Sequence, residues 1–96
     1  MNEMRDKFLP VGSVVLLKNA TKRILVIGYY PQEVGSNTVY DYSGVPFPEG
    51  LVDSKKILLF NYEQINEINH FSINDEETKK FFEEIEKVKE RENGNL

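Results

Sequence analysis

The chain has 96 residues, of which 40% are hydrophobic and none is cysteine, and its formal net charge is −4. This length predicts one domain, and the lack of cysteine excludes disulfides and cysteine-ligated metals. No apolar run reaches the roughly 20 residues of a membrane-spanning helix, and no secretory signal is visible, so we expect a cytoplasmic protein. An acidic chain also lacks the basic face that nucleic-acid binding requires.

The first third of the chain predicts a β-hairpin. Residues 1–8 are expected to form a flexible lead-in, followed by a turn at 10–13. Two runs rich in β-branched residues, 13–18 and 23–30, then predict two strands. Both runs are continuously apolar, a pattern typical of strands covered on both faces. We therefore expect another element to cover the second face of this hairpin.

The middle of the chain predicts three further short strands, at 38–42, 56–60 and 67–73. Residues 44–50 combine prolines and glycines, and we expect an extended crossover there. Asn61 and Gln64 have the spacing of a capping box, which predicts a short helical turn.

The C-terminal segment predicts a helix over residues 74–92. Asn74 and Glu77 have capping-box spacing at its start. An apolar stripe follows, formed by Phe81, Phe82, Ile85 and Val88. We expect this stripe to cover the second face of the hairpin; the alternative is that it docks on a partner chain.

Strands followed by a helix indicate an α+β fold. The expected architecture is a small, strongly bent antiparallel β-sheet or partly open barrel with a C-terminal α-helix. A single domain over residues 1–96 would then contain a β-rich core at 9–73 and the helix at 74–92.

The sequence shows no pattern of catalytic, cofactor-binding or metal-binding residues. His70 is the only histidine, and the glycines match no phosphate-binding or dinucleotide-binding motif. A non-enzymatic protein without a cofactor is therefore expected, and an enzyme ranks last among the functions considered.

The segment from Tyr40 to Leu51 is the best candidate for binding a protein partner. Prolines and glycines preorganise its path, and its aromatic side chains offer contact area. We predict Tyr42 and Phe47 as anchors, with Tyr40, Val45 and Leu51 around them. The alternative is that these side chains fill the core or close the barrel.

Four segments also carry a resemblance to a known family: LPVGSVVLLK at 9–18, KRILVIG at 22–28, YDYSGVPFPEG at 40–50 and FN at 60–61. They resemble a family of small bacterial domains encoded beside LXG toxins of the Gram-positive type VIIb secretion system. The matching positions include Gly12, Gly44, Pro46, Pro48, Glu49 and Gly50. The resemblance brings no catalytic residues and no established binding residues.

The resemblance implies a cytoplasmic accessory protein that binds its cognate secreted toxin before export, as a chaperone or a targeting factor. The expected partner region is the N-terminal helical part of the toxin, with no nucleic acid and no membrane involved. Self-association as a homo-oligomer stays open. The alternative function is that of an immunity protein, which would neutralise the toxic domain of a neighbouring toxin.

Overall fold

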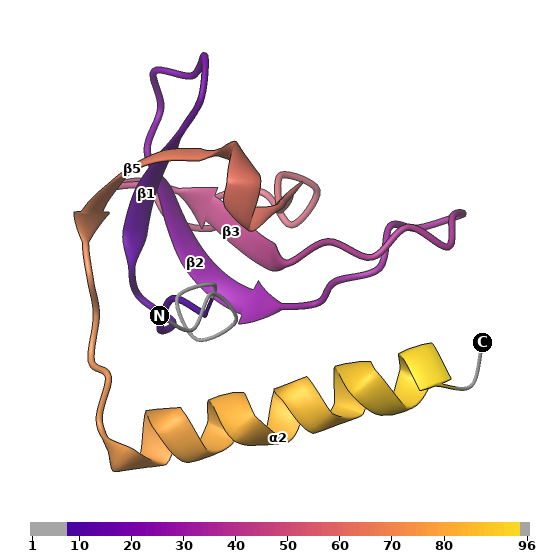
Figure 1. Cartoon of the computed structure of the whole chain (residues 1–96). Helices are drawn as coiled ribbons and strands as arrows, with labels where there is room; N and C mark the ends of the chain where they lie inside the picture. Colours follow the sequence, from indigo (N-terminus) through magenta and orange to yellow (C-terminus); the bar gives the residue numbers. More distant parts are fainter. Residues whose placement is uncertain (1–7, 95–96) are drawn as a thin grey trace.

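The computed structural model describes residues 8–94 and contains one antiparallel sheet and one long helix (Figure 1). The elements in chain order are β1 (Val14–Leu17), β2 (Ile24–Tyr29), β3 (Tyr42–Pro46), β4 (Leu58–Phe60), the 3-10 turn η1 (Tyr62–Gln64), β5 (Ile65–His70) and α2 (Glu76–Gly94). The predicted α+β fold with a C-terminal helix is confirmed.

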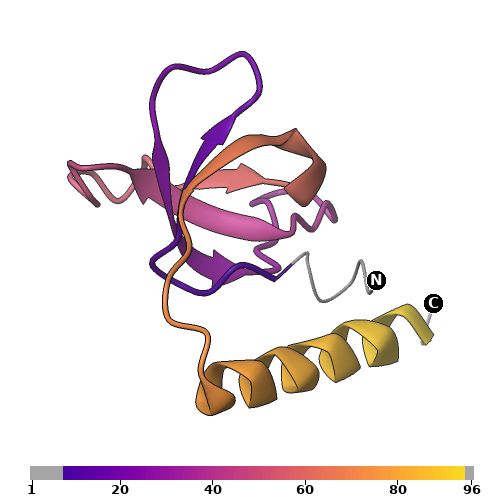
Figure 2. The same ribbon diagram turned by 60° about the vertical axis from the view of Figure 1, so that its left-hand side comes forward.

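The five strands form one open sheet in the order β4-β3-β2-β1-β5, and every neighbouring pair is antiparallel. The first four strands follow one another as a meander, and the chain then returns so that β5 pairs with β1. In β2 the register shifts between Val26 and Gly28, and such a bulge sharpens the bend of a strand. The sheet therefore curls strongly but stays open, because β4 and β5 are its two edges (Figure 2).

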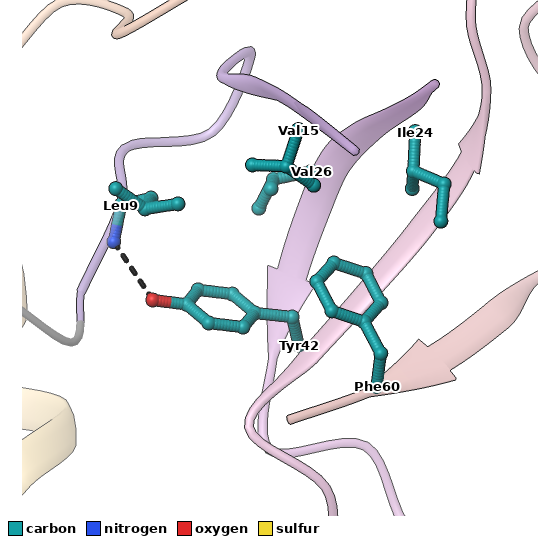
Figure 3. Close-up of a cluster of buried hydrophobic side chains, with 6 residues drawn as sticks. All are labelled: Leu9, Val15, Ile24, Val26, Tyr42 and Phe60. Atoms are coloured by element: carbon teal, nitrogen blue, oxygen red, sulfur yellow. Dashed lines mark hydrogen bonds between the residues drawn. The ribbon is translucent and has the colours of Figure 1, made fainter. Parts of the chain in front are cut away.

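The core lies inside the curl of the sheet (Figure 3). It consists of six side chains that are each at most 4% exposed: Leu9, Val15, Ile24, Val26, Tyr42 and Phe60. The rings of Tyr42 and Phe60 stack with their centroids 5.4 Å apart. Gly44 leaves room for this packing, since a Cβ there would lie 2.4 Å from Cγ2 of Ile24 and 2.8 Å from the carbonyl oxygen of Leu25.

Two predicted strands lie elsewhere than expected. The sequence predicts the third strand at 38–42, but β3 runs over Tyr42–Pro46 and so extends into the stretch 44–50 that was expected to be a crossover. Gly44 serves close packing rather than a turn, a role that glycine also has in strands. The last strand was predicted at 67–73, but β5 begins directly after η1 and ends at His70. The hairpin strands β1 and β2 lie where predicted.

The helix does not cover the hairpin as predicted. The sheet curls tightly enough to enclose its own inner face, and α2 runs along the open side of the curl (Figures 1 and 2). The ring contacts that α2 makes with the rest of the domain are with Phe8 and Tyr29. On the outer face of the hairpin, Leu25 stays half-buried and Ile27 is 38% exposed.

The helix also begins later than predicted, because Asp75 rather than Asn74 is its N-cap. A carboxylate oxygen of Asp75 accepts hydrogen bonds from the backbone N–H of Thr78 at 3.0 Å and from its hydroxyl at 2.8 Å. These bonds hold the pKa of the Asp75 carboxyl below its ordinary value. Asparagine and aspartate are both good N-cap residues, so the local sequence did not separate the two positions.

Candidate functional site

A cleft of about 620 Å³ lies between α2 and the sheet. Its volume falls within the range of roughly 300–1,000 Å³ that is typical of binding pockets. Its lining residues are Phe8, Leu9, Tyr62, Ile68, Phe71, Asn74, Lys79, Phe82, Glu83 and Glu86. The lining thus combines apolar side chains from both elements with charged side chains from α2.

The sheet side of the cleft carries large apolar side chains that are only partly covered. Ile68 lies opposite Val15 in the β1–β5 ladder and so points to the same face as the core. Because β5 is an edge strand, Ile68 stays 45% exposed, and Phe71, directly after the strand, is 51% exposed. Neighbouring exposed apolar side chains of this kind often mark an interaction surface.

The helix side of the cleft is held to the sheet by a cluster of four aromatic rings, which we call the aromatic latch: Phe8, Tyr29, Phe81 and Phe82. The ring of Phe82 stacks on Phe8 with centroids 5.4 Å apart and meets Tyr29 edge-on at 5.7 Å. Phe81 packs against Tyr29, also at 5.7 Å. Phe82 is 8% exposed and Phe81 is 43% exposed, so the predicted stripe is divided between a buried and an exposed side.

Phe8 has a structural role that the sequence did not reveal. Residues 1–7 of the predicted flexible lead-in lie outside the described residues, but Phe8 is buried, with 6% exposure. The next residue, Leu9, is fixed by two tyrosines: its carbonyl oxygen accepts a hydrogen bond from the hydroxyl of Tyr29, and its N–H donates to the hydroxyl oxygen of Tyr42 at 3.0 Å. These two bonds hold Phe8 at the edge of the core, where it receives Phe82.

Three tyrosines near the cleft, Tyr29, Tyr30 and Tyr42, stay protonated over the physiological pH range. Burial raises the pKa of Tyr29 to about 12, and it also raises the pKa of Tyr42. The pKa of Tyr30 is raised to about 12 by burial first and then by the carboxylates of Asp41 and Glu86. The influence of Glu86 on Tyr30 means that α2 carries negative charge close to the end of β2.

The five residues predicted to bind a partner do not form one surface. Tyr42 is fully buried and Val45 is 2% exposed, because β3 is an interior strand of the sheet. Both side chains are buried in the folded chain, which corrects the prediction for them. Tyr40 and Phe47 are half-buried, and Leu51 is 56% exposed, so for these three the prediction stays a prediction.

The end of that segment is fastened to the loop between β1 and β2. The guanidinium of Arg23 lies over the ring of Phe47, 4.9 Å from its centroid, and the backbone N–H of Phe47 donates to the carbonyl oxygen of Arg23. Lys22 forms an ion pair with Glu49. Phe47 is thus held in place by the domain's own residues.

The cleft is bordered by both apolar and charged side chains, so it suits a ligand that has an apolar group to bury next to a charged group. Among residues 8–94, no group of three or more His, Cys, Asp or Glu side chains could hold a metal ion. In the same part of the chain, no helix is both long and apolar enough to cross a membrane. His70, the only histidine, is exposed at the end of β5.

These features define a small α+β domain in which an open, bent sheet and a C-terminal helix border a partly apolar cleft. The chain belongs to the DUF4176 family, a domain family of unknown function, whose sequence profile matches residues 8–81. That match covers all five strands and ends inside α2. No curated protein and no solved structure shows significant similarity to the chain.

Proposed function

We propose that this domain is a non-enzymatic binding module: a cytoplasmic accessory protein that holds a cognate LXG toxin for type VII secretion, as its chaperone or targeting factor. The observation that carries the proposal is the cleft between α2 and β5, where Ile68 and Phe71 are about half exposed in the isolated domain. Covering these apolar side chains with a partner removes their surface from water, which stabilises the complex. The choice of an LXG toxin rests on the resemblance of the four sequence segments.

A helical segment is the kind of partner that this site favours. The cleft has a helix on one side and a sheet edge on the other, a shape in which the apolar stripe of an amphipathic helix packs well. The N-terminal region of an LXG toxin is expected to be helical and to need its apolar stripe covered before export. The aromatic latch would keep α2 in place while the partner packs beside it.

Co-purification with the two halves of the neighbouring toxin tests the proposal. We expect this protein to be retained by the N-terminal helical half and not by the C-terminal toxic half. Retention by the C-terminal half alone, together with protection of cells, would support the immunity function and overturn the proposal. Retention by neither half would overturn both.

A pair of matched variants then tests whether the cleft is the binding site. Phe71→Asp places a charge on the sheet side of the cleft and is expected to weaken binding by about 2 kcal/mol or more, as at an interface anchor. Val34→Asp is the control, because Val34 is 99% exposed in the loop between β2 and β3. Equal binding by both variants, at equal melting temperatures, would place the interface elsewhere.

A further inference from the structure

The cleft between α2 and the sheet has an exposed part and a covered part. In the exposed part, Ile68 and Phe71 are 45% and 51% exposed. In the covered part, Phe8, Leu9 and Phe82 also line the cleft, but they are only 6%, 1% and 8% exposed. The aromatic latch, in which the ring of Phe82 stacks on Phe8, shields this part. An apolar segment of a partner can therefore reach the covered part only when α2 moves away from the sheet.

The connection between β5 and α2 has the form of a short hinge. On the sheet side, the backbone N–H of Ser72 donates a hydrogen bond to the hydroxyl oxygen of the buried Ser13 at 3.1 Å. On the helix side, the carboxylate of Asp75 caps the first turn of α2. Between these two fixed points lie only Ile73, which is 72% exposed, and Asn74, which is also exposed. The chain runs alone from the sheet to the helix at this point (Figures 1 and 2).

A small rotation about this hinge is enough to open the aromatic latch. Phe82 comes eight residues after Asn74, so it lies about 12 Å along the helix from the hinge. A rotation of α2 by about 15° away from the sheet moves the ring of Phe82 by roughly 3 Å. Its centroid distance to Phe8, which is 5.4 Å in the closed position, then exceeds the roughly 7 Å within which aromatic pairs pack. The helix therefore has two distinct positions, latched and released.

We propose that α2 is a hinged lid on the cleft, which turns about Ile73 and Asn74 and is fastened in its closed position by the aromatic latch. Opening admits the apolar segment of a partner to the covered part of the cleft, and the latch re-forms when the segment has packed beside α2. The inference rests on the proposed function, in that the cleft is the binding site, and it adds how access to that site is controlled. The partner then associates at a rate that follows the fraction of chains with an open lid.

Spin labels measure the motion in the chain alone. The chain has no cysteine, so Asn66→Cys on β5 and Glu84→Cys on α2 place labels at two exposed positions. Position 84 lies about 15 Å from the hinge, so opening by about 15° lengthens the label distance by up to roughly 4 Å. We expect one distance in the parent chain and a second, longer one when Phe82→Ala is added. Val88→Ala changes an exposed side chain of α2 outside the latch and should keep the parent distance. An unchanged distance with Phe82→Ala would overturn the inference.

Association kinetics test whether the lid controls access to the cleft. Phe81 is the residue to change, because it contacts Tyr29 in the latch but is not among the residues that line the cleft. Phe81→Ala loosens the latch and leaves the lining intact, so it should raise the association rate of the N-terminal half of the toxin about fivefold in stopped-flow measurements. Val88→Ala should leave that rate unchanged. If Phe81→Ala altered only the dissociation rate, α2 would be a fixed wall of the cleft and the inference would be wrong.

The two experiments separate failure of the lid from failure of the proposed function. If the N-terminal half of the toxin associates with the parent chain and with Phe81→Ala at the same rate, the lid is wrong and the proposed function stands. If that half binds neither chain while Phe82→Ala shows the longer label distance, the hinged lid is supported and the assignment to the toxin is wrong.

Discussion

Replacing Phe82 by alanine is expected to release α2 from the sheet without unfolding the sheet. Phe82 is 8% exposed, and its ring contacts two others, Phe8 at 5.4 Å and Tyr29 at 5.7 Å. Burial of a phenylalanine side chain contributes about 1.5–3 kcal/mol, and each aromatic pair adds about 0.5–1.5 kcal/mol. Docking of α2 should therefore weaken by roughly 3 kcal/mol, in line with the usual cost of a buried Phe→Ala change.

The consequence should be confined to α2 and the residues that it covers. None of the six core residues belongs to α2, and most of the stability of a helix in a protein comes from the packing of its apolar face. Amide hydrogen exchange in α2, followed by mass spectrometry, is thus expected to accelerate about a hundredfold. Exchange in β2 should keep the rate of the parent chain.

The neighbouring residue provides the control for this experiment. Phe81 is 43% exposed and makes one ring contact with the sheet, so Phe81→Ala should weaken the docking of α2 by only about 1 kcal/mol. If the two variants accelerated exchange in α2 equally, or if Phe82→Ala left it unchanged, the aromatic latch would not be what holds the helix.

Three further predictions concern the sheet and the start of the helix. Gly44→Ala should lower the free energy of unfolding by about 1–3 kcal/mol in urea titrations, because its Cβ would meet the core and a backbone oxygen. Gly28→Ala should cost less, since its nearest neighbour is a serine hydroxyl that can rotate, and a larger loss there would contradict this account. Tyr42→Phe leaves the buried N–H of Leu9 without its partner and should cost about 1–3 kcal/mol in the same titration; an unchanged midpoint would refute that role. The pKa of Asp75 is lowered in the folded chain, so the stability that its capping bonds contribute is fully present at a pH above the ordinary pKa of 3.8 and is lost as the pH falls through the lowered pKa. An NMR titration of the first turn of α2 checks this, and a raised pKa would contradict it.

Local patterns in the sequence were sufficient for the hairpin and for the existence of the helix. The apolar runs around Val15 and Val26 have the composition of strands, and the C-terminal segment has helical periodicity with a cap at its start. Both signals depend only on residues close in the chain. The same signals could not choose between Asn74 and Asp75 as the cap, since either residue caps a helix well.

Burial was the property that the local patterns could not supply. Tyr42 and Val45 lie in a segment whose composition suggested an exposed aromatic surface, yet both side chains are buried because β3 is an interior strand. Ile68 is the opposite case: isoleucine is a typical core residue, but Ile68 stays exposed because β5 is an edge strand of the sheet. Which strand is interior depends on pairing between residues far apart in the chain.

The candidate binding surfaces also depend on which side chains the tertiary structure buries. The sequence by itself determined that Phe81, Phe82 and Val88 form an apolar stripe, because helical spacing places them on one side of α2. Only the tertiary structure decided that Phe82 is buried and that the other two are left to solvent. The sheet curls until it encloses its own core, so the helix meets it through the few rings at its open side, and the rest of the apolar surface of α2 remains uncovered.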